Sequence, residues 1–557
     1  MNSKTFLAVK PNIGNFSCAL VSGILLIIAW PPHRAGFLLC IAFVPFIYAL
    51  DHTAKQKQVF LFSLTNALLW AVGTMYWEAQ ITTTHANLKL FFFIPAFIVF
   101  ALLMTIPWLI WKRLSKYLSN YLWWLSLPLL WTAYEFLTGK GDLAMTWLNL
   151  EFGLSYYPNL IRFSQFAGPH GVAFLIMSVN VLVYLIIKNR KNTVKLKTPF
   201  ALLGVIVSGI LISDLTAGKG VTGKESITKK VAVIQPDWLS YYTPDKNAFQ
   251  DEVDTLKKLT LPLAGQHPDL IVCSEGFIHH QSAETHPILM ERIDEDTVIM
   301  QLKALSATLN APIITGIELA GVYASSSRPT LTAQYIRPGY YYDTYNAAVL
   351  IPPKGDVQIY VKNKLCPFIE RVPFLELISI FNGADSAINN KIISYGTMQA
   401  NTVFQYADMR IAPAICWENS FPDYMAETLR KNNANMVVVV SSNFSLGKTA
   451  AEIDAAYSIP LAVKMQLPLV RCANTGISCF IDKNGKVQQA SGWDESKVLV
   501  QDVELNSYST FYIKYGDIAG RFSFYASLIL ILYALFRKIA NRLSSKEAAP
   551  AKKHAKK

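Results

Sequence analysis

The chain has 557 residues, of which 52% are hydrophobic and only 16% are charged. That composition excludes an ordinary soluble protein and favours several membrane spans beside a water-soluble domain. The net charge of +13 is compatible with nucleic-acid binding, but the basic residues gather beside apolar segments and in the C-terminal tail, as the positive-inside rule expects of a membrane protein. We therefore expect no nucleic-acid partner.

Eight apolar runs predict membrane helices. They lie near residues 12–30, 35–50, 58–77, 90–111, 117–134, 169–187, 198–213 and 522–536. Several runs are shorter than the roughly 20 residues that a full span needs, but flanking Trp, Tyr and Lys side chains extend the anchoring. The first run lacks a small-residue cleavage site, so we expect an uncleaved span and not a removed signal peptide.

Basic loop residues predict the orientation of these helices. With eight spans, all the basic segments fall on one side of the membrane: the N-terminus with Lys4 and Lys10, the segment around Lys55 and Lys57, and residues 112–116, 188–197 and 537–557. The loop 78–89, on the other side, contains one lysine at its end. The positive-inside rule therefore predicts that both termini are cytoplasmic and that residues 215–520 lie outside the cytoplasm.

The segment 215–520 has a different pattern, in which short β-branched runs such as 231–235 and 436–440 alternate with helical stretches such as 248–264. Continuous apolar strands of this kind are usually buried on both faces between helices, so the pattern predicts one α/β sandwich domain. The predicted organisation is a bundle of seven membrane helices at 1–214, an extracytoplasmic catalytic domain at 215–520, an eighth helix at 521–538 and a basic cytoplasmic tail at 539–557.

Residues 139–167, between the fifth and sixth predicted spans, are aromatic and weakly charged. We expect them to lie at the membrane interface on the outer side. An ordinary loop is the alternative interpretation.

The seven cysteines contain no CxxC pair and no metal-ligand spacing. An odd count of this kind argues against a disulfide framework or a zinc site, so at least one thiol is expected to be free. We predict no bound metal and no cofactor.

Three segments of the predicted domain each end an apolar strand with a reactive side chain. These side chains are Glu275 after 271–274, Lys362 after the strand that ends at Val361, and Cys416 after 411–415. The ends of strands are where open α/β sheets collect their active sites, so the three side chains can converge. Taken singly, each side chain is weak evidence for an active site. A lone Cys is more often a small buried hydrophobe, and a lone Glu or Lys is more often a solvated surface charge.

Together the three side chains make chemical sense. A thiol becomes a useful nucleophile when a base takes its proton and a nearby cation holds the thiolate. Glu275 can be that base, while Lys362 can stabilise both the thiolate and the oxyanion of a tetrahedral intermediate. No histidine is required, and none lies beside Cys416 in the sequence. On the residues alone, Lys364 remains a second candidate for the cation.

In this order and in these contexts, Glu275, Lys362 and Cys416 resemble the Glu-Lys-Cys triad of the nitrilase superfamily, the carbon-nitrogen hydrolases. A wider set of motifs resembles the apolipoprotein N-acyltransferase family: Tyr345-Asn346, Lys362-x-x-Leu-x-Pro-Phe-x-Glu370-x-Val-Pro, Arg471-x-x-Asn474-x-Gly476, an Asp482-x-x-Gly485 turn and Trp147-Leu-x-Leu. The resemblance covers essentially the whole chain. It implies a polytopic helical membrane bundle joined to a nitrilase-like αββα sandwich.

The resemblance also implies the roles of the site residues. Cys416 would be the nucleophile, Glu275 the proton acceptor, and Lys362, selected over Lys364 by its spacing to Pro367, the stabiliser of the oxyanion and thiolate. A second glutamate that the family holds near its triad matches Glu370, which would orient the lysine or the base. Three further residues are predicted to support the site: Trp417, Glu418 and Asn443.

Three features depart from the family pattern. Trp417 stands where Tyr commonly follows the nucleophile, and Ile369 replaces a usual Gly. The stretch 441–447 replaces an Asn-Asp-x-Trp-Phe-Gly type of loop. None touches the triad, so acyl transfer is still expected, while the acyl pocket, the lid and the substrate preference are left open.

The implied reaction has two steps on the outer face of a bacterial inner membrane. Cys416 takes an acyl chain from a phospholipid, in the family typically phosphatidylethanolamine, and the resulting thioester acylates the α-amino group of a diacylglyceryl-cysteine on an apolipoprotein. We expect a monomer. The rival interpretations are a membrane-bound amidohydrolase acting on a small C–N substrate, and a transporter or receptor whose outer domain only binds a ligand. Transporters usually carry ionisable residues in mid-span, and these spans are nearly free of them.

Overall fold

The computed structural model describes residues 13–77, 86–142, 144–216, 227–237, 248–278, 288–367, 369–376, 379, 394–398, 402–443 and 447–554. Within these ranges, the side chains of 86–96, 216, 248–250 and 544–554 are not described. The predictions that concern Lys4, Lys10, the segment 78–85 of the loop 78–89, and the loop residues 444–446 lie outside the described residues.

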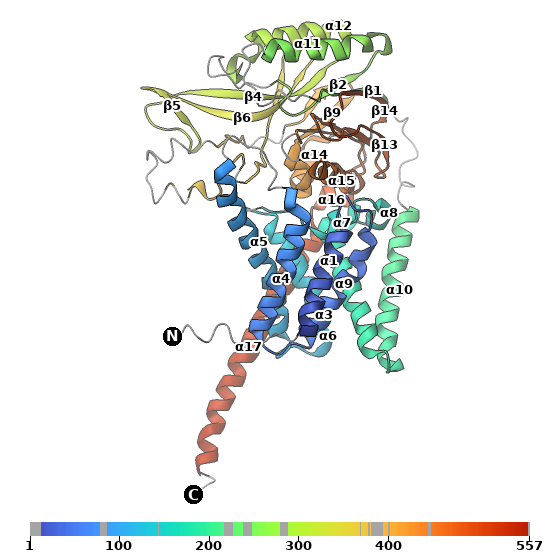
Figure 1. Cartoon of the computed structure of the whole chain (residues 1–557), viewed down its shortest axis with the longest axis vertical. Helices are drawn as coiled ribbons and strands as arrows, with labels where there is room; N and C mark the ends of the chain where they lie inside the picture. Colours follow the sequence, from blue (N-terminus) through green and yellow to red (C-terminus); the bar gives the residue numbers. More distant parts are fainter. Residues whose placement is uncertain are drawn as a thin grey trace.

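The molecule consists of an α/β domain stacked on one end of a helical bundle (Figure 1). The main helices of the bundle are α1 (Ile13–Ala29), α2 (Leu39–Ala42), α3 (Val44–Asp51), α4 (Gln56–Met75), α5 (Ala86–Leu114), α6 (Asn120–Thr138), α9 (Ser164–Asn189), α10 (Thr193–Thr216) and α17 (Ile518–His554). Although α17 follows the α/β domain in sequence, it returns to the bundle and packs against α6 and α9. Every apolar run that the sequence predicts to be a span is helical.

Five helices of the described residues are long and apolar enough to cross a membrane: α4, α5, α9, α10 and α17. This number is smaller than the eight predicted spans. The described part of helix α1 has 17 residues and ends at Ala29, because Pro31 and Pro32 follow closely and the residue before a proline disfavours the helical conformation. The segment Gly36–Asp51 is also apolar but short, and Pro128 lies inside α6. The helical region is thus a membrane bundle built from long and short apolar helices.

Two stacked sheets form the centre of the α/β domain. The first has the order β14-β1-β2-β4-β6-β5, with β3 paired to β4 and β7 to β6, and the second has the order β13-β12-β11-β10-β9-β8. Their strands are β1 (Thr228–Gln235), β2 (Leu270–Cys273), β3 (Ile288–Leu289), β4 (Ile313–Ala324), β5 (Gln334–Arg337), β6 (Tyr340–Ile351), β7 (Gln358–Val361), β8 (Phe404–Tyr406), β9 (Met409–Ile415), β10 (Met436–Ser441), β11 (Leu469–Ala473), β12 (Cys479–Ile481), β13 (Val487–Ala490) and β14 (Lys497–Glu504).

Helices cover the outer faces of both sheets. Helices α11 (Ala248–Thr260) and α12 (Thr297–Leu309) lie on the first sheet, and α14 (Pro422–Asn432) and α15 (Gly447–Met465) lie on the second. One apolar core fills each of the three spaces between these four layers. The strands β1, β2, β9, β10 and β11 pair in parallel and are almost wholly buried, as their continuous apolar sequences predict. The expected αββα sandwich is confirmed.

The layer formed by α14 and α15 faces the bundle, and α15 joins the two halves. Its residues Ile453, Tyr457 and Val463 belong to the apolar core of the bundle. The Tyr457 hydroxyl accepts a hydrogen bond from Trp30 Nε1 at 2.9 Å and donates one to the Trp147 carbonyl at 2.5 Å. The bundle and the α/β domain therefore share a continuous packed interior at α15.

A buried ion pair fixes the same contact. The segment 139–167 contains the short helices α7 (Leu150–Gly153) and α8 (Pro158–Ile161), which both contact α15. Glu151 Oε2 on α7 lies 2.5 Å from Lys464 Nζ on α15, and each side chain is only 1% exposed. This segment is thus a docking element for the α/β domain, and the interpretation as an ordinary loop is wrong.

We predict that breaking this pair destabilises the protein. Lys464→Met should lower the free energy of unfolding by about 3–5 kcal/mol, because it leaves the Glu151 carboxylate buried without its counter-charge. Adding Glu151→Leu should restore most of that loss. Thermal unfolding of the purified full-length protein, followed by tryptophan fluorescence, measures both effects.

A matched control is Lys483→Met, which breaks the exposed pair between Lys483 and Glu504, 3.2 Å apart. Exposed pairs contribute at most about 1 kcal/mol, so this variant should unfold close to the wild-type temperature. Equal destabilisation by Lys464→Met and Lys483→Met would contradict the special role of the buried pair.

Candidate active site

The three predicted site residues come from both sheets and meet between them. Glu275 follows β2 and Lys362 follows β7 in the first sheet, while Cys416 follows β9 in the second. Gly316 of β4 allows the turn at Glu275 to approach closely, since a Cβ on Gly316 would lie 2.5 Å from the Glu275 Cα atom. The three strand ends thus form one site.

A buried ammonium lies at the centre of this site. Lys362 Nζ lies 2.7 Å from Glu370 Oε1 and 3.3 Å from Glu275 Oε1, and the lysine side chain is 1% exposed. Asn346 Nδ2 donates to both carboxylates, at 2.8 Å to Glu275 and 2.9 Å to Glu370. Burial by itself would lower the pKa of Lys362, but the two carboxylates outweigh it and hold the pKa well above its usual value. The lysine is therefore a permanent cation.

Burial has the opposite consequence for Glu275. It raises the pKa of this carboxyl, and the negative charge of Glu370 acts in the same direction. The positive charge of Lys362 and the hydrogen bonds from Asn346 and Lys362 oppose the rise without cancelling it. Glu275 is therefore a stronger base than an exposed glutamate, as proton-accepting carboxylates in active sites require.

Cys416 stands at a sharp backbone turn. Its φ is +50°, a left-handed conformation that is uncommon for residues other than glycine. Strained backbone of this kind persists only where its surroundings enforce it. The turn continues as the 3-10 helix η7 (Cys416–Ser420), which directs the chain out of β9 towards α14.

Glu418 enforces this turn. One of its carboxylate oxygens accepts hydrogen bonds from the Ile415 backbone N–H at 2.9 Å and the Tyr360 hydroxyl at 2.7 Å. The other accepts from the backbone N–H groups of Asn363 and Lys364, at 2.8 and 3.0 Å. Glu418 thus ties the turn that carries Cys416 to the loop that carries Lys362, and its side chain is fully buried.

The Cys416 thiol is neutral at rest. Burial raises the pKa of Cys416 far above its usual value, and the negative charges of Glu275 and Asp454 add to the rise. The positive charge of Lys362 and a hydrogen bond with Ser441 lower the pKa by less. For this thiol to act as a nucleophile, a nearby base must therefore remove its proton during the attack.

A second polar cluster lies behind the thiol, and its central residue, Asp454, was not singled out from the sequence. Asp454 of α15 accepts hydrogen bonds from Ser441 Oγ and Asn443 Nδ2, each at 3.0 Å, and forms an ion pair with Arg471. Arg471 also donates to Asn443 Oδ1 at 3.1 Å. Although burial opposes it, this arginine and these hydrogen bonds lower the pKa of Asp454. Asn443, predicted to support the site, belongs to this cluster.

Two sequence signals mark this cluster. Asp454 stands inside an apolar helical run and Arg471 inside an apolar strand, and such charges are almost always paired when they are buried. Gly476, from the motif noted in the sequence, allows its loop to touch Asn443, because a Cβ there would lie 2.3 Å from Asn443 Oδ1. The motif Arg471-x-x-Asn474-x-Gly476 therefore forms the wall behind the thiol.

The other predicted residues lie at the edge of the site. The Trp417 ring is buried against the Trp147 ring, with their centroids 4.6 Å apart, and so faces the bundle. The Lys364 ammonium lies over the rings of Phe421 and Tyr424, at 5.6 and 5.5 Å, and not between the carboxylates. Cys366 was not singled out from the sequence, although its backbone N–H donates to Glu370 Oε2 at 2.7 Å.

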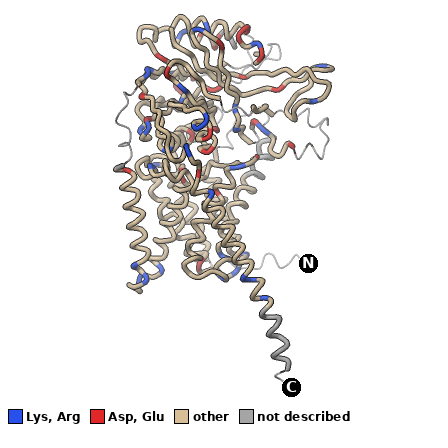
Figure 2. Tube along the Cα trace, turned by 180° about the vertical axis from the view of Figure 1, so that it is seen from behind, with Lys and Arg blue, Asp and Glu red and all other residues tan. Residues whose placement is uncertain are grey.

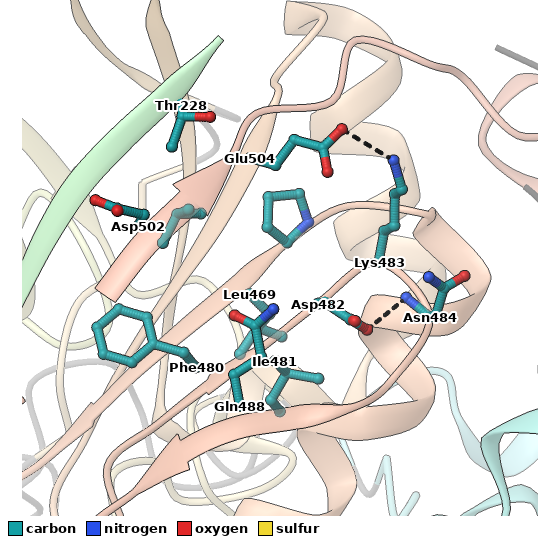
Figure 3. A pocket seen from close by; sticks show the side chains of 12 residues that line it. Thr228, Leu469, Phe480, Ile481, Asp482, Lys483, Asn484, Gln488, Asp502 and Glu504 are labelled. Carbon is teal, nitrogen blue, oxygen red and sulfur yellow. Dashed lines mark hydrogen bonds and ion pairs between the residues drawn. The ribbon is translucent and has the colours of Figure 1, made fainter. Parts of the chain in front are cut away.

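A separate pocket of about 270 Å³ lies at the end of β11, β12 and β14 (Figure 3). Lys483 is paired with Glu504 in it, and Asp482 accepts hydrogen bonds from the backbone N–H groups of Asn484 and Lys486. The pocket contains none of the predicted site residues. The Asp482-x-x-Gly485 motif is thus a structural turn. Among the described residues, no group of three or more His, Cys, Asp or Glu side chains is arranged to hold a metal ion.

Comparisons with known proteins agree with this architecture. A model described as the apolipoprotein N-acyltransferase N-terminal domain matches residues 22–182, and a carbon-nitrogen hydrolase model matches residues 230–512, just over half of the chain. The apolipoprotein N-acyltransferase of Chlorobaculum tepidum is 25% identical, with 94% of this chain and 97% of the relative covered. That of Geobacter metallireducens is 24% identical, with 90% and 92% covered.

Among solved structures, an amidase of the nitrilase superfamily from Nesterenkonia AN1 is 14% identical, covering 53% of this chain and 96% of the amidase with a TM-score of 0.36. The two domain models and the nearly full-length relatives carry the assignment of the chain. The chain belongs to the apolipoprotein N-acyltransferase family, and its α/β domain is a carbon-nitrogen hydrolase domain.

Proposed function

We propose that this protein transfers an acyl chain from a membrane phospholipid, through a thioester on Cys416, to the α-amino group of the diacylglyceryl-cysteine of an apolipoprotein. The observation that supports the proposal is that Cys416, Glu275 and Lys362 meet in one buried site. The helices next to this site, α14 and α15, pack on the membrane bundle. Phosphatidylethanolamine is the donor that the family resemblance suggests. The protein acts as a monomer.

In the first step, the Cys416 sulfur attacks the ester carbonyl carbon of the phospholipid. Glu275 accepts the thiol proton as the S–C bond forms, which the neutral resting thiol requires. The C–O bond to glycerol then breaks, and Glu275 returns the proton to the departing oxygen. The products are a thioester on Cys416 and a lysophospholipid.

Lys362 stabilises the tetrahedral intermediate of this step. An ammonium group has three N–H donors, and Lys362 gives two of them to Glu275 and Glu370. The third serves the oxyanion, where a fixed positive charge in a buried site lowers the barrier most effectively. Glu370 and Asn346 hold the ammonium and the base in place, and Glu418 holds the turn of the nucleophile, so these three are positioning residues.

In the second step, the free amine of the lipidated cysteine attacks the thioester carbonyl. The C–N bond forms, the C–S bond breaks, and the amine proton passes through Glu275 to the leaving Cys416 sulfur. A thioester is reactive enough towards an amine that no further energy source enters the reaction. Both substrates are lipids, which accounts for a site that packs against membrane helices through Trp417 and Trp147.

We further propose that the bundle crosses a bacterial inner membrane eight times, with the α/β domain on the periplasmic side and both termini in the cytoplasm. Lys and Arg residues gather at the end of the bundle remote from the α/β domain, while its middle is nearly free of charge (Figure 2). This distribution supports the orientation through the positive-inside rule. Besides the five long apolar helices, the remaining three spans would be α1, the segment Gly36–Asp51 and α6. Flanking aromatic and basic residues would anchor them in the membrane.

The thioester is the intermediate that tests this function. Incubation of the purified protein with a phospholipid that is radiolabelled in its acyl chain should leave a hydroxylamine-sensitive label on Cys416, and Cys416→Ala should carry none. Adding a synthetic diacylated lipopeptide should then move the label to the peptide amine. Discharge to water alone would favour an amidohydrolase, and the absence of any label from the wild type would leave a ligand-binding protein as the better account.

The pH dependence of the first step tests the assignment of the base. The proton acceptor works in its ionised form, so thioester formation should fall as the pH drops through the raised pKa of Glu275. Glu370→Gln removes a negative charge that raises this pKa, so the acid limb should move to lower pH in that variant, while the maximal rate also falls because Lys362 loses one carboxylate. Single-turnover rates provide the measurement, at pH values from about 4, close to the pKa of an exposed carboxyl, up to about 9.

Glu376→Gln is the matched control for this experiment. Glu376 is an exposed glutamate that pairs with Arg371 at 3.1 Å, and it makes no described contact with Lys362 or Glu275. The acid limb of this variant should coincide with that of the wild type. A shift of the Glu370→Gln limb to higher pH would rule out Glu275 as the base in this arrangement.

A further inference from the structure

A cavity of about 830 Å³ lies between α6, α9 and α10. Its lining includes Lys188, Asn189 and Lys195, at the turn between α9 and α10, so it belongs to the end of the bundle remote from the α/β domain (Figure 1). Its volume falls within the range of roughly 300–1,000 Å³ that is usual for ligand sites. None of its residues belongs to the acyl-transfer site.

The inner walls of this cavity are apolar. They are formed by side chains from three helices, namely Leu125, Phe174, Val181, Leu182, Leu202 and Val205. Helix α10 is mostly exposed, since only 11% of its most apolar stretch is buried inside the molecule. It packs mainly on α9. The cavity is therefore a groove whose apolar length runs along membrane helices, which suits a hydrocarbon chain.

The rim of the groove is polar and positively charged. Lys188 Nζ lies 2.6 Å from Asp51 Oδ2 and 5.1 Å from the centroid of the Trp124 ring. The same Asp51 oxygen also accepts the Tyr184 hydroxyl at 2.6 Å, so this carboxylate is shared by two donors. Lys195 is exposed, and no carboxylate among the described residues forms an ion pair with it.

Further positive charge surrounds this rim. Lys112 Nζ donates to the carbonyl oxygens of Leu50 and Asp51, at 2.7 and 3.0 Å, and its charge shares the attraction of the Asp51 carboxylate with Lys188. Arg190 and Lys191 lie in the turn between α9 and α10, and Figure 2 shows Lys and Arg residues gathered at this end of the bundle. One carboxylate therefore stands among several cations, and the rim is complementary to an anion.

We propose that this groove binds an anionic phospholipid of the adjoining membrane leaflet. Its phosphate would lie between Lys188 and Lys195, and one of its acyl chains would lie along α9 and α10. An anionic headgroup keeps its full charge beside the lysines, whereas a zwitterionic headgroup brings an ammonium of its own that the rim repels. The apolar walls require a chain as well as a phosphate, so free phosphate alone does not satisfy the site.

Lipid retention by the full-length protein tests this site without any acyl transfer. The protein would carry Cys416→Ser, so that the catalytic thiol consumes no lipid, and would be titrated in detergent with dioleoyl phosphatidylglycerol or dioleoyl phosphatidylcholine. Native mass spectrometry would count the retained lipids. We expect phosphatidylglycerol to be retained at lower concentration than phosphatidylcholine, and Lys195→Ala to weaken its retention about five-fold, as the loss of one lysine near a lipid surface predicts.

Two matched pairs of variants separate the groove from general surface charge. Lys197→Ala removes an exposed lysine from the same helix that does not line the cavity, and should leave retention unchanged. Leu202→Trp fills the groove from an exposed position and should abolish selective retention, whereas Val207→Trp, exposed on α10 outside the lining, should not. Equal retention of the two lipids, or equal effects within either pair, would overturn the proposal.

Discussion

The burial of the Lys362 ammonium is the constraint on which the rest of the site depends. A charged amine that is withdrawn from water is tolerated only with counter-charges and hydrogen bonds close by, and here Glu275 and Glu370 provide both. These carboxylates come from separate segments, so the pairing fixes where β2, β7 and the loop after Lys362 must meet. The same surroundings set the protonation states, since the two carboxylates keep the lysine charged, while burial makes Glu275 more basic and leaves the Cys416 thiol neutral. Geometry and reactivity thus have one origin.

The reactive side chains at the ends of strands were predictable from the sequence. A buried strand is a continuous apolar run, and the first polar residues after it lie at the edge of the sheet. Glu275, Lys362 and Cys416 each have that position, and the structure brings all three together. Asp454 was not predictable in the same way, since its helix resembles an ordinary apolar core helix and its partner Arg471 lies on a different element. Pairing of that kind is decided by tertiary packing. The count of eight spans stays a prediction for a related reason: hydropathy detects apolar runs, but it does not show that the run Gly36–Asp51 folds as the separate short helices α2 and α3.

Helix α15 links the chemistry to the membrane. One side of it contributes Tyr457 and Val463 to the core of the bundle, and its Asp454 holds Ser441 and Asn443 beside the thiol. Lys464, near its end, is locked to Glu151 of the bundle. A shift of the bundle against the α/β domain would therefore move α15 and with it the wall behind Cys416. Helix α15 is thus an outer helix of the sandwich and at the same time a structural part of the bundle.

The groove and the acyl-transfer site lie at opposite ends of α9. This helix runs from Ser164 to Asn189, and at about 1.5 Å per residue it is long enough to cross the hydrocarbon core of roughly 30 Å. Its lower end carries Lys188, and its upper part contacts α15 and α16 (Phe511–Tyr515). A lipid held at Lys188 is therefore in the leaflet opposite to the α/β domain and cannot be the acyl donor for Cys416. Any influence of that lipid on the reaction has to act through the packing of α9, which makes the groove a structural site and not a substrate site.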